Sequence, residues 1–552
     1  MTSLADRTRR KVAGISLPGL LVAVLFFCAS LTPSLVPRGA ELQGALGGVV
    51  AAIGYAGWSA ADWTWRWLDL PVPRRQPAAA LRIVAALAAL GLLAAVLWQA
   101  SAWQNSVRAL WQMPPVDTIA PLKVATISAG VFGALLVLGR LFAWLLGRAA
   151  AALSRYVPRK LAAFAGFVIA VAVFTTLLNG VLLQGVLRLI DVSSRTADAL
   201  VAPDLAIPDA AGQTGSAASL VAWEDLGRWG RSFVASAPTA EEIAAFWQAP
   251  ARDPIRVYVG LTAAGDARQR AQLAFEELRR VGGFDREVLV IAVPTGSGWL
   301  DPGSHDPLDY MHRGDIATVA VQYSYLSSWV SVLVDPTYGL REAQALFDLV
   351  YGHWISLPKD DRPRLYLHGL SLGAFLSQST VPLLDVLGDP FDGAMWAGSP
   401  FLSEFWHFVI ARRAPGSPAW RPRFGNDSLI RSTNQVDVLD DADAPWGPIR
   451  LVFLQYASDP IVFFDPSLAF ARPDWLRGQR GPDVSAKMRW IPVVTMLQVG
   501  FDMAVALGVR GYGHDYIAEH YIPAWAETTQ PAGWTAAREA ALTALFEGRP
   551  VR

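Results

Sequence analysis

The sequence predicts an α-helical transmembrane domain followed by an α/β domain with a mainly parallel, doubly wound sheet. Three observations predict this architecture. The chain has 552 residues, 53% of them hydrophobic and only 17% charged, with a mean hydropathy of +0.30. A soluble domain usually carries about 25% charged residues. Long apolar runs are confined to residues 1–190, and short apolar runs alternate with helical segments after residue 254. The length allows two or three domains.

The formal net charge of zero is the sum of two opposite parts. Residues 1–190 contain 17 Lys and Arg but only five acidic residues, a net charge of +12. Because the whole chain has 47 residues of each sign, the remaining 362 residues carry −12. No chain-wide basic field predicts a nucleic-acid partner. The single cysteine, Cys28, excludes an intrachain disulfide framework and a cysteine-rich zinc site.

Five apolar stretches in the first 190 residues are long enough to cross a membrane, since a spanning helix needs about 20 mostly apolar residues. They are roughly 12–36, 42–61, 80–100, 122–146 and 161–187. The second is the weakest because it is rich in Gly and Ala. Pro33 and Pro37 are expected to end the first.

The basic residues in the loops predict the orientation of these spans. With five spans, 12 Lys and Arg lie on the side of the N-terminus and five lie on the opposite side. Short cytoplasmic loops carry the excess of Lys and Arg. We therefore expect a multi-pass protein with its N-terminus in the cytoplasm and everything after residue 190 on the extracytoplasmic side. Losing one span from the count would reverse the second expectation.

Residues 191–250 are predicted to be a linker with short helices, because 202–219 is rich in Ala, Pro, Gly and Ser. Thr239 is a candidate cap for a helix that carries Glu241 and Glu242 in its first turn. Residues 251–552 are predicted to form the α/β domain. Aromatic residues gather in 401–449, which is a candidate lid.

Alternating strands and helices predict the sheet of this domain. The predicted strands are 255–261, 287–293, 316–323, 364–368, 393–397 and 449–456, and the predicted helices include 267–281, 340–355 and 372–384. The strands are continuous apolar runs. Such runs are typical of a parallel sheet with helices on both faces.

The run Gly369-Leu370-Ser371-Leu372-Gly373 fits the G-x-S-x-G pattern of a nucleophilic serine. That serine needs a tight, strained turn between a strand and a helix, and the two glycines remove side chains that would clash in the turn. The pattern alone is weak, and a plain Gly/Ser turn is the alternative. An apolar strand before it and an apolar helix after it favour Ser371 as a nucleophile.

A serine nucleophile needs a base, and the base needs an orienting acid. Behind such a turn the expected chain order is Ser, acid, His. Asp459 is the predicted acid, because it lies just past the strand at 449–456. His514, in a glycine loop, is the predicted base, and His520, in a stretch predicted to be helical, is the alternative. The weaker alternative acids precede that strand: Asp437, Asp440, Asp441 and Asp443.

The oxyanion hole needs two backbone N–H groups. Leu372, the residue after the nucleophile, is the first candidate. The second is expected in the loop 295–299, where Gly296, Ser297 and Gly298 allow a close approach of the backbone; an ordinary turn is the alternative. A polar cluster nearby lacks the spacing of metal ligands, so neither a metal nor a cofactor is predicted. Its members are Asp301, His305, Asp306, Asp309 and His312.

The three loops that carry Ser371, Asp459 and His514, together with the runs 294–302 and 314–326, resemble a bacterial family of membrane-anchored α/β-hydrolases. Its members join an N-terminal multi-span domain to a C-terminal domain of the α/β-hydrolase fold. The resemblance covers nearly the whole chain. It implies a Ser371-Asp459-His514 triad and a place in the bacterial cell membrane, but no substrate. The more usual His before the nucleophile is replaced by Leu370.

These observations predict a membrane-bound serine hydrolase, esterase- or lipase-like, that cleaves an acyl ester through an acyl-enzyme. The anchor and the aromatic residues of 401–449 favour a lipophilic or lipid-like ester, with membrane lipids as the other partner. Two alternatives stay open: an acyltransferase that uses the same triad, and a non-catalytic sensor or scaffold with a hydrolase-like domain. The oligomeric state is not predicted.

Overall fold

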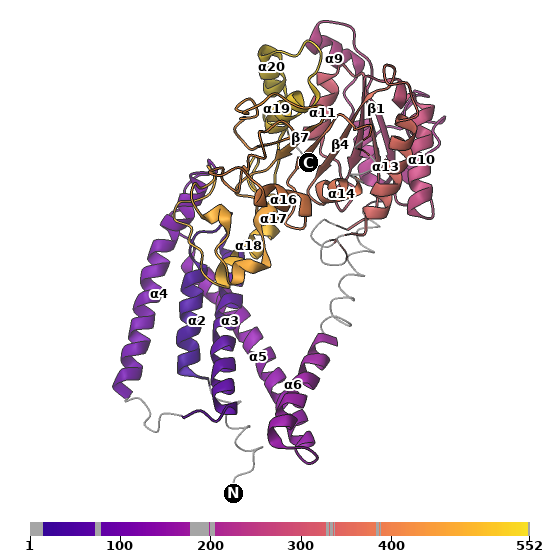
Figure 1. Cartoon of the computed structure of the whole chain (residues 1–552). Coiled ribbons are helices and arrows are strands. Elements are labelled where there is room, and N and C mark those ends of the chain that lie inside the picture. The colour runs from indigo at the N-terminus through magenta and orange to yellow at the C-terminus, as the bar shows by residue number, and fades with distance from the viewer. Residues whose placement is uncertain are drawn as a thin grey trace. The chain divides into compact units, whose positions relative to one another are not determined.

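The computed structural model divides the chain into two units (Figure 1). The helical unit comprises Met1–Leu187 and Phe464–Val505, and the sheet unit comprises Arg188–Phe463 and Ala506–Arg552. The structure describes residues 15–71, 79–176, 198, 205–326, 331, 335, 337–381, 386 and 388–549. The sequence predicted one continuous α/β domain over 251–552. That prediction differs from the structure, because the segment Phe464–Val505 groups with the N-terminal helices.

Nine described helical elements build the helical unit: α2 (Leu17–Ser30), α3 (Ala40–Trp67), α4 (Ala79–Arg108), α5 (Pro121–Leu153), α6 (Arg159–Thr175), η4 (Pro466–Ala469), η5 (Asp474–Leu476), α18 (Val494–Asp502) and η6 (Met503–Val505). Three of the described helices, α3, α4 and α5, are long and apolar enough to cross a membrane. They contain the second, third and fourth predicted spans.

The first and fifth predicted spans match shorter helices. The 14 residues of α2 reach about 21 Å at 1.5 Å per residue, which is less than the roughly 30 Å of a bilayer core. The helix ends at Ser30, ahead of Pro33, and residues 1–14 lie outside the described part. Helix α6 covers the start of the fifth predicted span, and the remainder from residue 177 lies outside the described residues.

The second predicted span, which lies in α3, is weakly apolar because it is rich in Gly and Ala. Two of its glycines form the surface that packs against α5. A Cβ atom added to Gly44 would lie 2.7 Å from the Cβ of Ile127 in α5, and one added to Gly48 would lie 2.6 Å from the Cβ of Val131. Small residues four apart let two helix backbones approach closely. Helices α3 and α5 therefore pack at a distance that larger residues would prevent.

The segment Phe464–Val505, called the inserted segment below, packs against the end of α2. Val494 of α18 packs with Leu46 and Val50 of α3. The Nε2 of Gln498 donates to the carbonyl oxygen of Thr32 at 2.9 Å. The buried Asp502 carboxylate accepts from the backbone N–H of Leu35 at 3.1 Å. These contacts hold the chain that leaves α2 after the helix has ended at Ser30.

Seven parallel strands form the sheet, in the order β1-β3-β2-β4-β5-β7-β6. They are β1 (Ile255–Val259), β2 (Val288–Val293), β3 (Ile316–Val321), β4 (Arg364–Leu370), β5 (Gly393–Ala397), β6 (Ile430–Thr433) and β7 (Arg450–Leu454). Every described pair in the sheet is parallel, which confirms the predicted mainly parallel sheet. Strand β6 was not predicted and lies inside the candidate lid.

Helices cover both faces of the sheet, as a doubly wound sheet requires (Figure 1). Helices α10, α13 and α14 lie on one face, and α8, α11 and α19 on the other. The helical elements of this unit are η2 (Trp223–Leu226), α8 (Gly227–Ala235), α9 (Ala240–Trp247), α10 (Ala267–Arg280), η3 (Gly283–Asp285), α11 (Pro302–Met311), α13 (Leu340–Trp354), α14 (Leu372–Thr380), α16 (Glu404–Ala411), α17 (Pro460–Phe463), α19 (Ala518–Thr529) and α20 (Ala536–Phe546).

The described part of the predicted linker belongs to the sheet unit. Gly230 of α8 lies so close to Tyr258 of β1 that any side chain would overlap that ring. Helix α9 begins as predicted: Thr239 Oγ1 accepts from the Glu242 backbone N–H at 3.2 Å, and the Glu242 carboxylate accepts from the Thr239 N–H at 2.8 Å. Within 205–250, helix α8 therefore packs on β1 of the sheet, and α9 is one of the short helices that the sequence predicts.

Candidate active site

The serine turn has the strained geometry that its motif predicts. Strand β4 ends at Leu370, Ser371 has φ 57° and ψ −127°, and α14 begins at Leu372. A positive φ is unfavourable for a residue with a side chain and marks stored strain. A side chain at Gly369 would overlap the backbone of Gly373, and one at Gly373 would overlap the carbonyl of Val293. Both positions therefore require glycine.

His514 and Asp459 are paired in a buried environment. The imidazole Nδ1 lies 2.6 Å from Asp459 Oδ2, and both side chains are buried. The same Asp459 oxygen accepts from the hydroxyl of Tyr516 at 2.9 Å, and the other oxygen accepts from the Ile461 backbone N–H at 2.9 Å. The carboxylate is thus held in place from three directions. Sequence reasoning missed Tyr516, although it stands two residues after the predicted base.

The second nitrogen of the imidazole is available. His514 Nε2 is buried and has no hydrogen-bond partner among the residues that the structure describes. An imidazole whose Nδ1–H is held by a carboxylate presents Nε2 as the proton acceptor. This is the arrangement that a general base requires.

The end of β5 lies beside both the serine and the histidine. The Ser371 N–H donates to the carbonyl oxygen of Ala397 at 3.0 Å. A Cβ added to the next residue, Gly398, would lie 2.6 Å from His514 Cε1, and Gly398 has φ 55°. The two predicted catalytic residues are therefore brought to the same strand end. A glycine directly after a predicted strand was the available signal for Gly398, and it was not used.

The histidine loop is tied to the aspartate loop through its backbone. The N–H of Gly513 donates to Ser458 Oγ at 3.0 Å, and the N–H of His514 donates to the carbonyl oxygen of Ala506 at 2.8 Å. Gly511 and Gly513 have positive φ values of 77° and 63°. Glycine adopts this region at no steric cost. The glycine loop is thus a defined turn that aims His514.

The predicted oxyanion residues lie at two positions next to the serine turn. Leu372 is the first residue of α14, where backbone N–H groups have no partner within the helix. The loop 295–299 follows β2, the neighbour of β4 in the sheet. There the Gly298 N–H donates to the Thr295 carbonyl oxygen at 2.9 Å, so it holds the turn together. Gly296 and Ser297 stay as predictions for the second donor.

Comparison with known proteins decides the family. A family model described as "Alpha/beta-hydrolase family" matches residues 255–542, more than half of the chain, and one described as "Alpha/beta-hydrolase family N-terminus" matches residues 31–238. The chain belongs to this alpha/beta-hydrolase family. No curated protein and no solved structure matches it. The predicted recognition is confirmed at this level.

Other histidines of this alpha/beta-hydrolase are engaged elsewhere. His368 Nδ1 lies 2.7 Å from the Met395 carbonyl oxygen and its Nε2 lies 3.0 Å from Ser304 Oγ. His520 Nδ1 contacts the hydroxyl of Tyr456. Burial lowers the pKa of both imidazoles to about 4. Both are consequently neutral core groups at neutral pH, and neither is paired with Asp459.

The polar cluster on and beside α11 is structural. Asp301 caps the helix by accepting from the Gly303 N–H at 2.8 Å. Asp306 and Asp309 both bind the buried Arg256, at 2.6 and 2.7 Å. Burial, only partly offset by Arg256, raises the pKa of Asp309 to about 6. Within the described ranges, no group of His, Cys, Asp and Glu is placed to hold a metal ion.

The aromatic residues behind the lid prediction mostly belong to the core. The ring of Trp406 lies 4.9 Å from that of Phe453 in β7, centroid to centroid, and Trp406 is fully buried. Phe405 packs on the same Phe453 ring, and Trp420 is also buried. Phe408 is 46% exposed. Most of these residues therefore pack on the sheet at β7, and they give little support to a lid.

Proposed function

We propose that this protein is a serine hydrolase in which Ser371 is the nucleophile, His514 the general base and Asp459 the residue that orients the base. One observation carries the proposal. A buried imidazole is held by a buried carboxylate at 2.6 Å, with its Nε2 unpartnered among the described residues, next to a strained serine turn. Buried His305 and His312 also have ring nitrogens without a hydrogen-bond partner among the described residues, so His514 is distinguished by its pairing with the buried Asp459 carboxylate.

The reaction follows from these positions. The Ser371 hydroxyl oxygen attacks the acyl carbonyl carbon while His514 Nε2 takes the hydroxyl proton. Asp459 stabilises the imidazolium that forms. The oxyanion is stabilised by the backbone N–H of Leu372 and by a second N–H from the loop after β2. The imidazolium then gives its proton to the departing alcohol, and a water molecule activated by His514 releases the acyl group from Ser371.

We further propose that the substrate is a lipophilic or lipid-like ester. The chain that carries the site also has three described helices able to cross a membrane by length and composition. A membrane-bound enzyme meets membrane-soluble substrates at high local concentration. The catalytic unit is proposed to lie on the extracytoplasmic side, as the loop charges predict.

A fluorophosphonate probe tests the nucleophile in the full chain. The probe is expected to label the wild type covalently and to leave Ser371→Ala unlabelled. Ser379→Ala is the matched control, because Ser379 lies on the same helix α14 with its side chain exposed. Absence of labelling in folded wild-type protein, or equal labelling of Ser371→Ala, would overturn the proposal.

The same preparation separates hydrolysis from acyl transfer and from a scaffold. A panel of p-nitrophenyl esters with increasing acyl chain length measures the substrate preference. Long acyl chains are expected to react faster than acetyl, and a sharp preference for acetyl would contradict the lipid-like substrate. Adding a long-chain alcohol shows whether acyl groups move to an acceptor other than water. A labelled protein with no turnover on any ester would favour the scaffold.

A further inference from the structure

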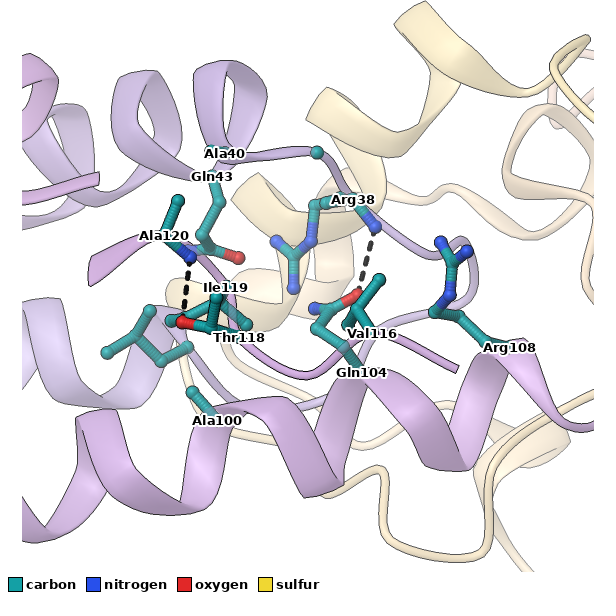
Figure 2. A pocket seen from close by; sticks show the side chains of 12 residues that line it. Arg38, Ala40, Gln43, Ala100, Gln104, Arg108, Val116, Thr118, Ile119 and Ala120 are labelled. Carbon is teal, nitrogen blue, oxygen red and sulfur yellow. Dashed lines mark hydrogen bonds between the residues drawn. The ribbon is translucent and has the colours of Figure 1, made fainter. Parts of the chain in front are cut away.

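We propose that the helical unit contains a binding site for a phosphate with a neighbouring hydroxyl, as in the glycerophosphate head group of an anionic lipid. The site is a cavity of about 150 Å³ within this unit (Figure 2). It lies where the end of α2, the start of α3, the C-terminal part of α4 and the loop before α5 meet. This inference is independent of the proposed hydrolase reaction, since it concerns other residues.

The buried guanidinium of Arg38 is the first evidence for a bound ligand. Its side chain is fully buried, and only its Nη2 makes a hydrogen bond, to the Thr32 carbonyl oxygen at 3.0 Å. Nε and Nη1 have no hydrogen-bond partner in the described part of the chain. A buried charged donor without an acceptor is unfavourable, so an acceptor in the cavity would stabilise the fold.

Asp502 orients Arg38 without satisfying it. The Oδ1 of Asp502 lies 3.7 Å from Arg38 Nε, which is an ion-pair distance but too long for a hydrogen bond. The other oxygen of Asp502 is taken by the Ser34 hydroxyl and by the backbone N–H groups of Leu35 and Val36. The ion pair therefore leaves donor capacity on the guanidinium, which points toward the side chains of Gln43 and Gln104 in Figure 2.

The other polar groups of the lining define the ligand. Arg108, half-buried on α4, adds a second guanidinium, and no carboxylate lines the cavity. Gln43 Oε1 is buried and has no partner among the described residues, so it can accept from one O–H group. A phosphate offers oxygens in several directions to two arginines, whereas the two oxygens of a carboxylate share one plane. Phosphate with an adjacent hydroxyl satisfies all three groups.

The remaining lining and the size of the cavity favour a lipid as the source. Leu31, Ala100 and Ile119 give apolar walls, and Thr118 and Gly39 at its edge are exposed. A cavity of this volume holds a molecule of about the size of benzene. It therefore takes a head group and leaves the acyl chains outside, beside helices that are apolar enough for a membrane.

Native mass spectrometry tests the site. The full chain is purified in detergent, mixed with one defined lipid at a time, and released from the detergent in the instrument. Phosphatidylglycerol is expected to remain bound one to one. Phosphatidylcholine should not, and phosphatidylmethanol, which keeps the charge but lacks the hydroxyls, should bind several-fold more weakly. Free glycerol phosphate is the second source of the same chemistry. If it binds as tightly as phosphatidylglycerol, the lipid assignment is overturned.

Two variants test the location. Arg108→Gln should weaken phosphatidylglycerol binding about tenfold, which corresponds to the loss of one charge-assisted hydrogen bond. Ala40→Leu fills the cavity from the start of α3 and should abolish binding. Arg148→Gln, on α5 and outside the cavity, is the matched control and should bind like the wild type. If Arg108→Gln and Ala40→Leu both bind phosphatidylglycerol as tightly as the wild type does, the proposed location of the site is overturned.

Folding is checked by the thermal unfolding midpoint of each variant. If a variant fails to fold, the contrast between phosphatidylglycerol, phosphatidylmethanol and phosphatidylcholine on wild-type protein still decides. Equal binding of all three lipids overturns the proposal. Fluorophosphonate labelling of Ser371 is recorded in parallel, so a failure of the proposed hydrolase function is seen separately from a failure of lipid binding.

Discussion

The buried His368 makes a specific prediction about stability and pH. Burial lowers its pKa from the usual 6.5 to about 4. The unfolded chain takes up this proton as the pH falls through 6.5, but the folded chain does so only near pH 4. The unfolded state therefore binds more protons in this window, and the free energy of unfolding falls with falling pH. The contribution of His368 is about 1.4 kcal/mol per pH unit and roughly 3 kcal/mol in total.

The perturbation that isolates this contribution is His368→Asn. The variant loses contacts with Ser304 and Met395 and should be less stable by about 1–3 kcal/mol at any pH. The diagnostic quantity is the slope of unfolding free energy against pH, which should be shallower by about 1.4 kcal/mol per unit between pH 6.5 and 4. Other buried histidines are present in both proteins and cancel in the comparison.

The assay is urea unfolding of the full chain in lipid nanodiscs, followed by near-ultraviolet circular dichroism from pH 7.5 to pH 4.5. Above pH 6.5 the difference in stability between the two proteins should be constant, because His368 is then neutral in both states. Below pH 6.5 the difference should shrink as the wild type loses stability faster. Parallel slopes in the two proteins would refute the reasoning.

Further predictions concern the site, a helix cap and the topology. Gly398→Ala brings a Cβ to 2.6 Å from His514 and should slow fluorophosphonate labelling at least tenfold, whereas Gly388→Ala, which points into open space, should not. Asp459→Asn should slow labelling by about 10³–10⁴-fold because it favours the wrong tautomer; normal labelling would contradict this. Thr239→Ala removes a capping box and should lower the urea-derived free energy of unfolding by about 1 kcal/mol. A C-terminal alkaline phosphatase fusion should be active outside the cytoplasm, and activity of a cytoplasm-only reporter instead would refute the five-span topology.

Much of the sheet was predictable because its strands are buried on both faces. Strand β5 has the predicted bounds, and the predicted strands contain the observed β1, β2, β3 and β7, whereas β4 runs two residues beyond its predicted end, to Leu370. Strand β6 was missed because Ile430–Thr433 contains Arg431 and two hydroxyl residues, a composition that is ordinary for a loop. It is a strand because it pairs with β7 at the sheet edge, and Glu527 binds Arg431 at 2.9 Å. That partner is distant in sequence.

The serine turn was predictable because its requirements are local. Glycines two residues on either side of Ser371 relieve clashes within one turn. Gly398 and Tyr516 act through space on residues from other loops; the position of Gly398 directly after a predicted strand was its one local signal, and Tyr516 has none. The inserted segment was missed for the same reason, since the contact between Ser34 and Asp502 joins residues 468 positions apart. The sequence around residue 464 contains no pattern that indicates packing against the N-terminal helices.

The inserted segment determines which fragments of the protein can be produced as folded units. A chain trimmed to residues after 187 would keep Phe464–Val505 but lose the helices on which it packs. Val494 would lose its neighbours Leu46 and Val50, and Asp502 would lose its three hydrogen-bond donors and Arg38. Such a fragment is expected to aggregate. A soluble catalytic unit would instead require residue 463 to be joined to residue 506 by a short new loop, so the two units are interleaved along the chain.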